Sequence, residues 1–135
     1  MKRSILLSDY VADTMALVLH LEKRKSSHNV NLIFEAADRG ELTIYIPAMV
    51  FAEILYLSER KRISLDISDI QGHMARQKTY KEIPLSLDIV KTADEINDIP
   101  ELHDRLIAAT ARYQNLELVT NDPKIQNSTF VSTVW

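Results

Sequence analysis

The stretch LHDRLIAATARYQNLELVTND, residues 102–122, decides the fold class. Apolar residues recur three and four positions apart in its first half, which predicts a helix over residues 102–113. The segment LELVT at 116–120, mostly aliphatic, then predicts a strand, and Asp122 with Pro123 opens a turn. A helix that leads directly into a strand is one unit of an alternating α/β fold.

The same alternation extends through the rest of the chain. Strands are expected at 10–12, 42–46, 80–83 and 130–134, and helices at 15–25, 29–39, 48–60, 68–77 and 86–96. Alternating strands and helices indicate an α/β fold with a parallel sheet and helices on both of its faces. With 135 residues and no repeat or linker, the chain is expected to form a single domain spanning residues 1–135.

The composition excludes several kinds of chemistry. The absence of cysteine excludes disulfides, thiolate metal sites and a cysteine nucleophile, and it suits a cytoplasmic protein. Two glycines are too few for a phosphate-cradling glycine-rich loop. The apolar run at residues 5–7 stops at Ser8, too soon for a signal peptide. No segment approaches the roughly 18 apolar residues of a membrane span, so we expect no membrane association.

Glu53 occupies an unusual position for a charged residue. Its predicted helix places Val50, Ile54 and Leu57 on the same apolar face. The carboxylate should therefore be at least partly buried, and a buried charge needs a cation or a change of protonation. An ion pair with an arginine or lysine would meet that need as well as a metal would.

Asp104 repeats this pattern. It shares the core-facing stripe of its helix with Ile107, Ala108 and Ala111. The ordinary explanation is that an acid in the first turn of a helix is favoured by the helix dipole. Taken alone, Asp104 therefore does not require a catalytic role.

The other two candidate acids follow predicted strands. Asp13 ends the strand at 10–12 and could cap the next helix, although Thr14 could serve instead. Asp122 precedes Pro123, a common arrangement for a helix cap with proline at the first helical position. Each of these acids also has an ordinary structural explanation.

Together, however, the four acids indicate one site. All follow strands or lie in the first half of helices, and in a parallel sheet such points gather at the carboxyl ends of the strands. Two charges about 4 Å apart repel by roughly 4 kcal/mol at an effective dielectric near 20, so the cluster requires a hard cation. Oxygen ligands suit Mg²⁺ or Mn²⁺, which can activate water for phosphodiester hydrolysis. Asp13 and Asp104 are the expected central ligands. Glu53 and Asp122 would complete or orient the shell.

Three segments resemble the successive motifs of PIN-domain nucleases. They are VADTMALVLHL at 11–21, YIPAMVFAEILYL at 45–57 and the opening stretch at 102–122. The similarity is greatest to the toxin members of VapBC-type toxin–antitoxin pairs. It identifies the family's acids with the four described above. Thr14 matches the hydroxyl residue that follows the first acid, and Thr120 the one that precedes the fourth.

The resemblance implies more than the residue pattern does. It implies a three-layer α/β/α domain with a five-stranded, mainly parallel sheet, and a Mg²⁺- or Mn²⁺-dependent endoribonuclease. It also implies an RNA substrate, a homodimer and a small antitoxin protein as partner. The apolar segments 17–21 and 54–57 could form a dimer contact or could equally belong to the core.

RNA binding would depend on local basic residues, because the net charge is −3. Arg105, beside Asp104, is the expected phosphate contact. Basic clusters at 23–25, 60–62 and 76–78 could also position RNA, although such clusters are usually just solvated helix ends.

Two other functions within the same family fit the sequence. The chain could be a PIN nuclease of RNA processing unrelated to toxin–antitoxin systems, or a catalytically silent PIN scaffold. A phospho-accepting receiver domain does not fit. It needs an acid pair after the first strand, whereas Asp13 has no acidic neighbour, and an acceptor acid after the third, where Ile83 and Pro84 stand.

Overall fold

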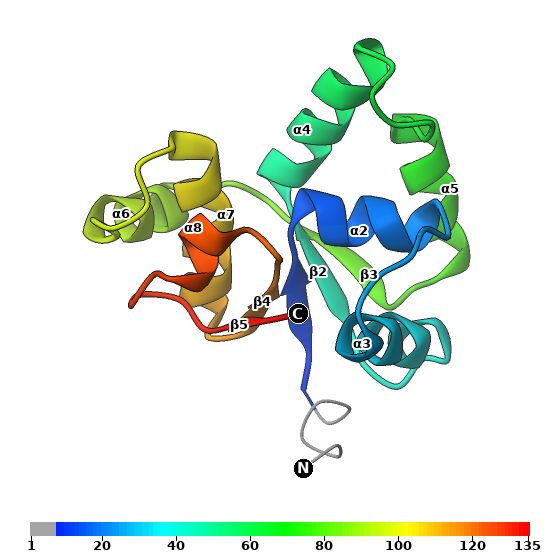
Figure 1. Cartoon of the computed structure of the whole chain (residues 1–135), viewed down its shortest axis with the longest axis horizontal. Helices are drawn as coiled ribbons and strands as arrows, with labels where there is room; N and C mark the ends of the chain where they lie inside the picture. Colours follow the sequence, from blue (N-terminus) through cyan, green and yellow to red (C-terminus); the bar gives the residue numbers. More distant parts are fainter. Residues whose placement is uncertain (1–7) are drawn as a thin grey trace.

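The computed structural model describes residues 8–135, which form a five-stranded sheet in which all neighbouring strands run parallel (Figure 1). The strands are β1 (Tyr10–Ala12), β2 (Ile44–Pro47), β3 (Tyr80–Ile83), β4 (Glu117–Val119) and β5 (Thr133–Val134). Their order in the sheet is β3-β2-β1-β4-β5. The predicted α/β class and the parallel sheet are confirmed.

Helices flank the sheet on both sides. They are α2 (Thr14–Leu21), α3 (His28–Asp38), α4 (Ala48–Glu59), α5 (Ile67–Arg76), α6 (Leu87–Glu95), α7 (Leu102–Gln114) and α8 (Pro123–Gln126). Figure 1 shows α6, α7 and α8 to the left of β1, and α2, α3 and α5 to its right. None of the helices in residues 8–135 is long and apolar enough to cross a membrane. The signal-peptide question concerns residues 1–7, which lie outside the described part.

Burial explains why β1 is central. Tyr10, Val11 and Ala12 are all buried, as expected for a strand covered on both faces. The register pairs Val11 with Tyr45 of β2 on one side and with Leu118 of β4 on the other. The first strand of the chain therefore lies in the middle of the sheet.

The order of the strands reverses at β1, and this reversal determines where a ligand crevice forms. The chain moves outward through β2 and β3, then crosses back to β4 and continues to β5. Because parallel crossovers are right-handed, these two halves of the chain place their helices on opposite faces. The carboxyl ends of β1 and β4 thus flank a topological switch point, the usual position of a ligand site in such sheets.

Several predicted boundaries were wrong. The first helix ends at Leu21 and not at residue 25, because Lys23 adopts a left-handed conformation with φ of 56°. Helix α3, predicted over 29–39, runs from His28 to Asp38, and its cap is Ser27, whose hydroxyl accepts from the backbone N–H of Val30 at 3.1 Å. The last strand, predicted over 130–134, is limited to two residues.

Candidate functional site

All four predicted acids line one pocket of about 310 Å³. It lies at the switch point, since Asp13 follows β1 and Asp122 follows β4 by a short loop. Glu53 comes from α4 and Asp104 from the first turn of α7. Segments that are far apart in the sequence therefore bring their carboxylates to the same point.

Asp13 is the most deeply buried of the four, with 8% of its surface exposed. Its Oδ1 accepts a hydrogen bond from the backbone N–H of Ala16 at 2.8 Å and so caps α2. Burial raises the pKa of Asp13 to about 6, and the charges of Glu53 and Asp122 add to the rise. Hydrogen bonds from Thr120 and Ala16 oppose the rise in this pKa without cancelling it.

Glu53 is half-buried, and its neighbours on the helix face are those that the sequence predicts. Val50 and Ile54 belong to the core. The partner of the carboxylate is the hydroxyl of Thr14, which donates to Oε1. Within residues 8–135 Glu53 forms no ion pair with lysine or arginine. The ion-pair explanation for this acid therefore does not hold for the described part of the chain.

Asp104 stands in the first turn of α7, after the cap residue Glu101. Its backbone N–H donates to Oε1 of Glu101 at 3.0 Å. Burial raises the pKa of Asp104 to about 6, followed in size by the charges of Asp122, Glu101 and Glu53. The nearby ammonium of Lys124 lowers this pKa slightly. A carboxylate among other carboxylates resists ionisation unless a cation joins them.

Thr120 connects the two acids that follow strands. It is fully buried, and its Oγ1 accepts from the backbone N–H of Asp122 at 3.1 Å. The same side chain is hydrogen-bonded to Asp13. Both predicted supporting residues, Thr14 and Thr120, therefore contact an acid of the pocket.

Asp13 and Asp122 both cap a helix and line the acid pocket. Oδ1 of Asp122 accepts from the backbone N–H of Lys124 at 2.9 Å and caps α8, as Oδ1 of Asp13 caps α2. A carboxylate has two oxygens, so a cap occupies one and leaves the other for a ligand. For both residues the structural role does not exclude a chemical one.

The donor chemistry of the pocket suits a hard divalent cation. Its candidate ligands are carboxylate oxygens. Burial is the main cause of the raised pKa values of Asp13 and Asp104, and the charges of Glu53 and Asp122 raise both pKa values further. Among residues 8–135, no three His, Asp or Glu side chains are arranged as a ready-made metal site. Closing the carboxylates around an ion would thus require side-chain adjustment.

The residues around the pocket differ in part from those that the sequence predicts. Asn121 lines the pocket and Lys124 acts on Asp104, although neither was singled out. Asn121 directly precedes Asp122 and Lys124 follows it by two positions, and this closeness in the sequence was the signal that could have identified them. Arg105, the predicted phosphate contact, is not among the pocket-lining residues, and its Nε is buried without a hydrogen-bond partner. One step along a helix turns a side chain by about 100°, which carries Arg105 away from the face of Asp104.

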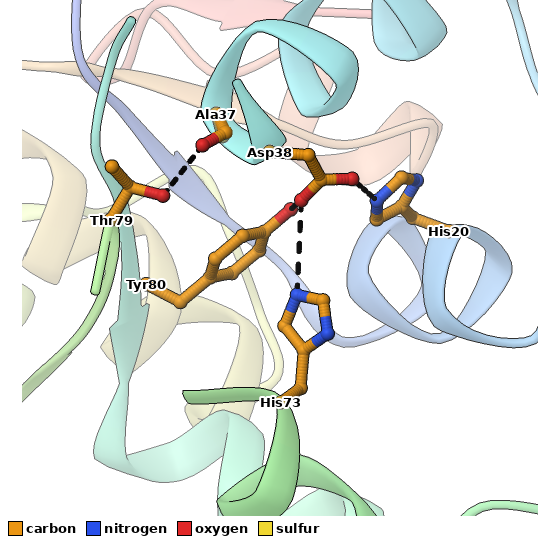
Figure 2. A network of polar contacts seen from close by, with 6 residues as sticks. All are labelled: His20, Ala37, Asp38, His73, Thr79 and Tyr80. Atoms are coloured by element: carbon orange, nitrogen blue, oxygen red, sulfur yellow. Dashed lines mark hydrogen bonds and ion pairs between the residues drawn. The ribbon is translucent and has the colours of Figure 1, made fainter. Parts of the chain in front are cut away.

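A second polar cluster lies at the opposite, amino end of the strands (Figure 2). Its centre is Asp38, whose carboxylate accepts from the hydroxyl of Tyr80 at 2.7 Å and lies 2.9 Å from Nε2 of His20. His20 faces Oδ2 of this carboxylate, and Nε2 of His73 lies 3.8 Å from Oδ1, the oxygen that accepts from Tyr80. The cluster joins α2, α3, α5 and β3, and it takes no part in the acid pocket.

Several solved structures have a fold similar to that of this chain. VapBC2 from Rickettsia felis, bound to a DNA fragment from its promoter, matches with a TM-score of 0.71 and 23% identity, covering 93% of this chain and 98% of that one. FitAcB from Neisseria gonorrhoeae matches with a TM-score of 0.65 and 16% identity, covering 93% and 96%. VapC20 from Mycobacterium tuberculosis, a sarcin–ricin loop cleaving toxin, matches at 0.62 and 14%, covering 91% and 97%.

At these identities the likeness concerns the fold alone. The curated proteins include no match to this sequence. A family model does match: the model of the PIN domain covers residues 10–130, which run from β1 almost to β5 and include every acid of the pocket. The chain therefore belongs to the PIN domain family.

Proposed function

We propose that this protein is a Mg²⁺- or Mn²⁺-dependent endoribonuclease. The observation that carries the proposal is the pocket at the switch point, in which four carboxylates from separate segments converge: Asp13, Glu53, Asp104 and Asp122. Without a cation such a cluster is electrostatically unfavourable, as the raised pKa values of Asp13 and Asp104 indicate. A site that carries this cost and is built on family motifs is a candidate for catalysis.

The residues of the pocket would divide the work. Asp13 and Asp104 would hold the cation, and Glu53 and Asp122 would complete the shell. When bound, the ion would supply an activated water and offset the charge of the phosphate. Thr14 holds the orientation of Glu53, and Thr120 that of Asp13. Such supporting contacts are as important to a metal site as its ligands.

Two basic residues are candidates for contact with the RNA phosphate. Lys124 is exposed and close enough to Asp104 to influence its pKa, so it is well placed to approach a phosphate at the pocket. Arg105 would need to turn toward the pocket to do the same. A phosphate contact of this kind would position RNA without reading its sequence.

We further propose that the nuclease is the toxin of a type II toxin–antitoxin pair, with a small antitoxin protein as its partner. The support is the similarity of fold to VapBC2 and FitAcB and to a toxin that cleaves the sarcin–ricin loop. RNA is taken as the substrate on the same grounds. The proposed location is the cytoplasm, where the protein would meet both RNA and the antitoxin without any association with a membrane.

A homodimer is part of the proposal. Leu17 and Ile54, in the two segments that could have formed a dimer contact, are fully buried in the core. Exposed apolar residues remain at Leu85, Leu87 and Val90, around the start of α6. They could supply a contact between two copies, and sedimentation of the purified protein would measure it.

The deciding experiment is cleavage of a panel of tRNA and ribosomal RNA by the purified, antitoxin-free protein. Cleavage in Mg²⁺ or Mn²⁺ should disappear with EDTA and in Asp104→Asn, and should persist in Asp94→Asn, a control at an exposed acid of α6. Folded protein that cleaves nothing would favour the catalytically silent scaffold. Cleavage that survives Asp104→Asn would mean that the active site lies elsewhere.

A further inference from the structure

A wide apolar groove adjoins the acid pocket. The α4 groove, as we name it, has a volume of about 790 Å³, and its apolar lining comes from Met15, Met49, Ala52 and Leu57. Thr14, Met15 and Glu53 line both the groove and the acid pocket. The two hollows therefore share a wall and form one continuous surface.

Two ring side chains from different elements stand at the groove. Tyr56, on α4, is 51% exposed, and His103, on α7, is also exposed. The guanidinium carbon of Arg60 lies 4.1 Å from the centre of the Tyr56 ring. An exposed tyrosine with a cation stacked on it brings an aromatic face and a positive charge to the same place.

We propose that the α4 groove binds a base of single-stranded RNA next to the phosphate that is cleaved, with Tyr56 as its stacking platform. This inference rests on the proposed nuclease function. Thr14 and Glu53 form one wall of the acid pocket, and the groove lies on the other side of that wall. A nucleoside attached to a phosphate at the carboxylates would reach the groove by passing along this wall. Unstacked RNA bases are bound in this way by aromatic side chains.

The charges around the groove favour RNA over another protein surface. Arg60 belongs to the basic cluster at 60–62, which is exposed at the end of α4. That cluster follows the last residue of α4, whereas Glu53, which α4 contributes to the acid pocket, lies in the middle of the helix. An RNA strand along this part of α4 could therefore meet the cleavage site at Glu53 and a cation beyond the end of the helix. A helix of a partner protein, or a second copy of this chain, would bury the apolar lining but would not use this arrangement.

The test measures how much the bases contribute to binding. Affinity is determined for a short oligoadenylate and for the matching ribose-phosphate strand that lacks bases, in Mg²⁺ and in the Asp104→Asn background to prevent cleavage. Tyr56→Ala should weaken binding of the oligoadenylate by about tenfold and leave binding of the base-free strand unchanged. Tyr56→Phe keeps the ring and should keep the affinity within about twofold.

The matched control is Tyr113→Ala, because Tyr113 is 49% exposed on α7 and does not line the groove. It should not alter either affinity. The proposal is overturned if the parent protein binds both strands equally, or if Tyr56→Ala weakens both by the same factor. It is also overturned if Tyr56→Ala separates a dimer into monomers while the contribution of the bases persists, since the groove would then be a contact between copies.

This readout is independent of cleavage. Failure of the nuclease proposal would appear as absence of metal-dependent cleavage by the wild-type protein, with base-dependent binding through Tyr56 intact. Failure of the groove proposal would appear as normal cleavage with no contribution of the bases at Tyr56.

Discussion

The hydroxyl of Thr14, at the start of α2, donates a hydrogen bond to Oε1 of Glu53 on α4. The two residues are 39 positions apart in the chain, and each belongs to the lining of the acid pocket. A half-buried carboxylate with one fixed oxygen has little freedom to rotate, and its other oxygen is directed by the first. The orientation of Glu53 on α4 thus depends on the position of helix α2.

Loss of this bond should reduce activity with little effect on folding. Thr14→Val keeps the shape of the side chain and removes the donor, so we expect cleavage to fall by about 10- to 100-fold. Thr14→Ser retains the hydroxyl and should retain most of the activity. Thr92→Val, on the distant helix α6, is the control. Full activity of Thr14→Val in single-turnover cleavage would show that Glu53 needs no orienting partner.

Removing a pocket charge should stabilise the metal-free protein. The pKa of Asp104 is raised to about 6 in the folded state, so its ionised form disfavours folding above that pH. Asp104→Asn should therefore raise the free energy of unfolding at pH 7.5 by on the order of 1 kcal/mol, a value discounted for solvent screening. Urea denaturation in EDTA measures the difference.

The same reasoning fixes the pH dependence of this difference. As pH falls from about 6 toward 4, protonation of Asp104 relieves the penalty in the wild type, while asparagine does not titrate. The advantage of Asp104→Asn should shrink over that interval and vanish below it. Asp94→Asn, at an exposed acid of α6, is measured in parallel as the control for loss of a surface carboxylate. An advantage of Asp104→Asn that grew with acidity would contradict the assigned direction of the pKa shift.

A divalent cation should stabilise the folded protein. A ligand that binds only the native state contributes about 2.7 kcal/mol at one hundred times its dissociation constant. Thermal unfolding should therefore shift upward with Mn²⁺ or Mg²⁺ in the wild type and much less in Asp13→Asn. Asparagine can still cap α2 in that variant, so the helix start is preserved. An unchanged melting temperature in the wild type at millimolar metal would argue against a cation site.

The Asp38 cluster should affect stability and not catalysis. Tyr80→Phe removes a 2.7 Å hydrogen bond to the carboxylate of Asp38, a loss we expect to cost about 1–3 kcal/mol. Cleavage should be unchanged, because Tyr80 begins β3 whereas the pocket lies at the carboxyl ends of strands. Tyr45→Phe, on the neighbouring strand β2, is the matched control. A cleavage rate that fell with Tyr80→Phe would connect the two ends of the sheet.

The local sequence pattern predicts some of the site residues but not all of the contacts that orient them. Glu53 and Asp104 could be recognised because an acid inside an apolar stripe violates the ordinary pattern of a helix. The partner of Glu53 could not be derived from spacing alone, since Thr14 meets it through the packing of α2 on α4. The direction of Arg105, by contrast, follows from helix geometry, because one step along α7 turns the side chain by about 100° away from the face of Asp104.

Boundaries and surfaces show the same division. The early end of α2 depends on a left-handed residue, Lys23, that is neither glycine nor asparagine, so no propensity indicated it. The α4 groove is formed by side chains of α2, α4 and the start of α7, which only the fold brings together. Exposure of Tyr56 in particular cannot be read from an apolar helix in which most residues could be core.

The reversal of strand order at β1 has a mechanical consequence. Asp13 and Glu53 belong to the half of the sheet that contains β1, β2 and β3, and Asp104 and Asp122 to the half that leads into and follows β4. Mutual repulsion of these acids therefore acts to separate β1 from β4. Backbone hydrogen bonds hold these two strands together, among them the one from the N–H of Asp13 to the carbonyl of Val119 at 3.1 Å. A cation bound there would link the two halves of the domain, and amide hydrogen exchange in β1 and β4 would slow when the cation is bound.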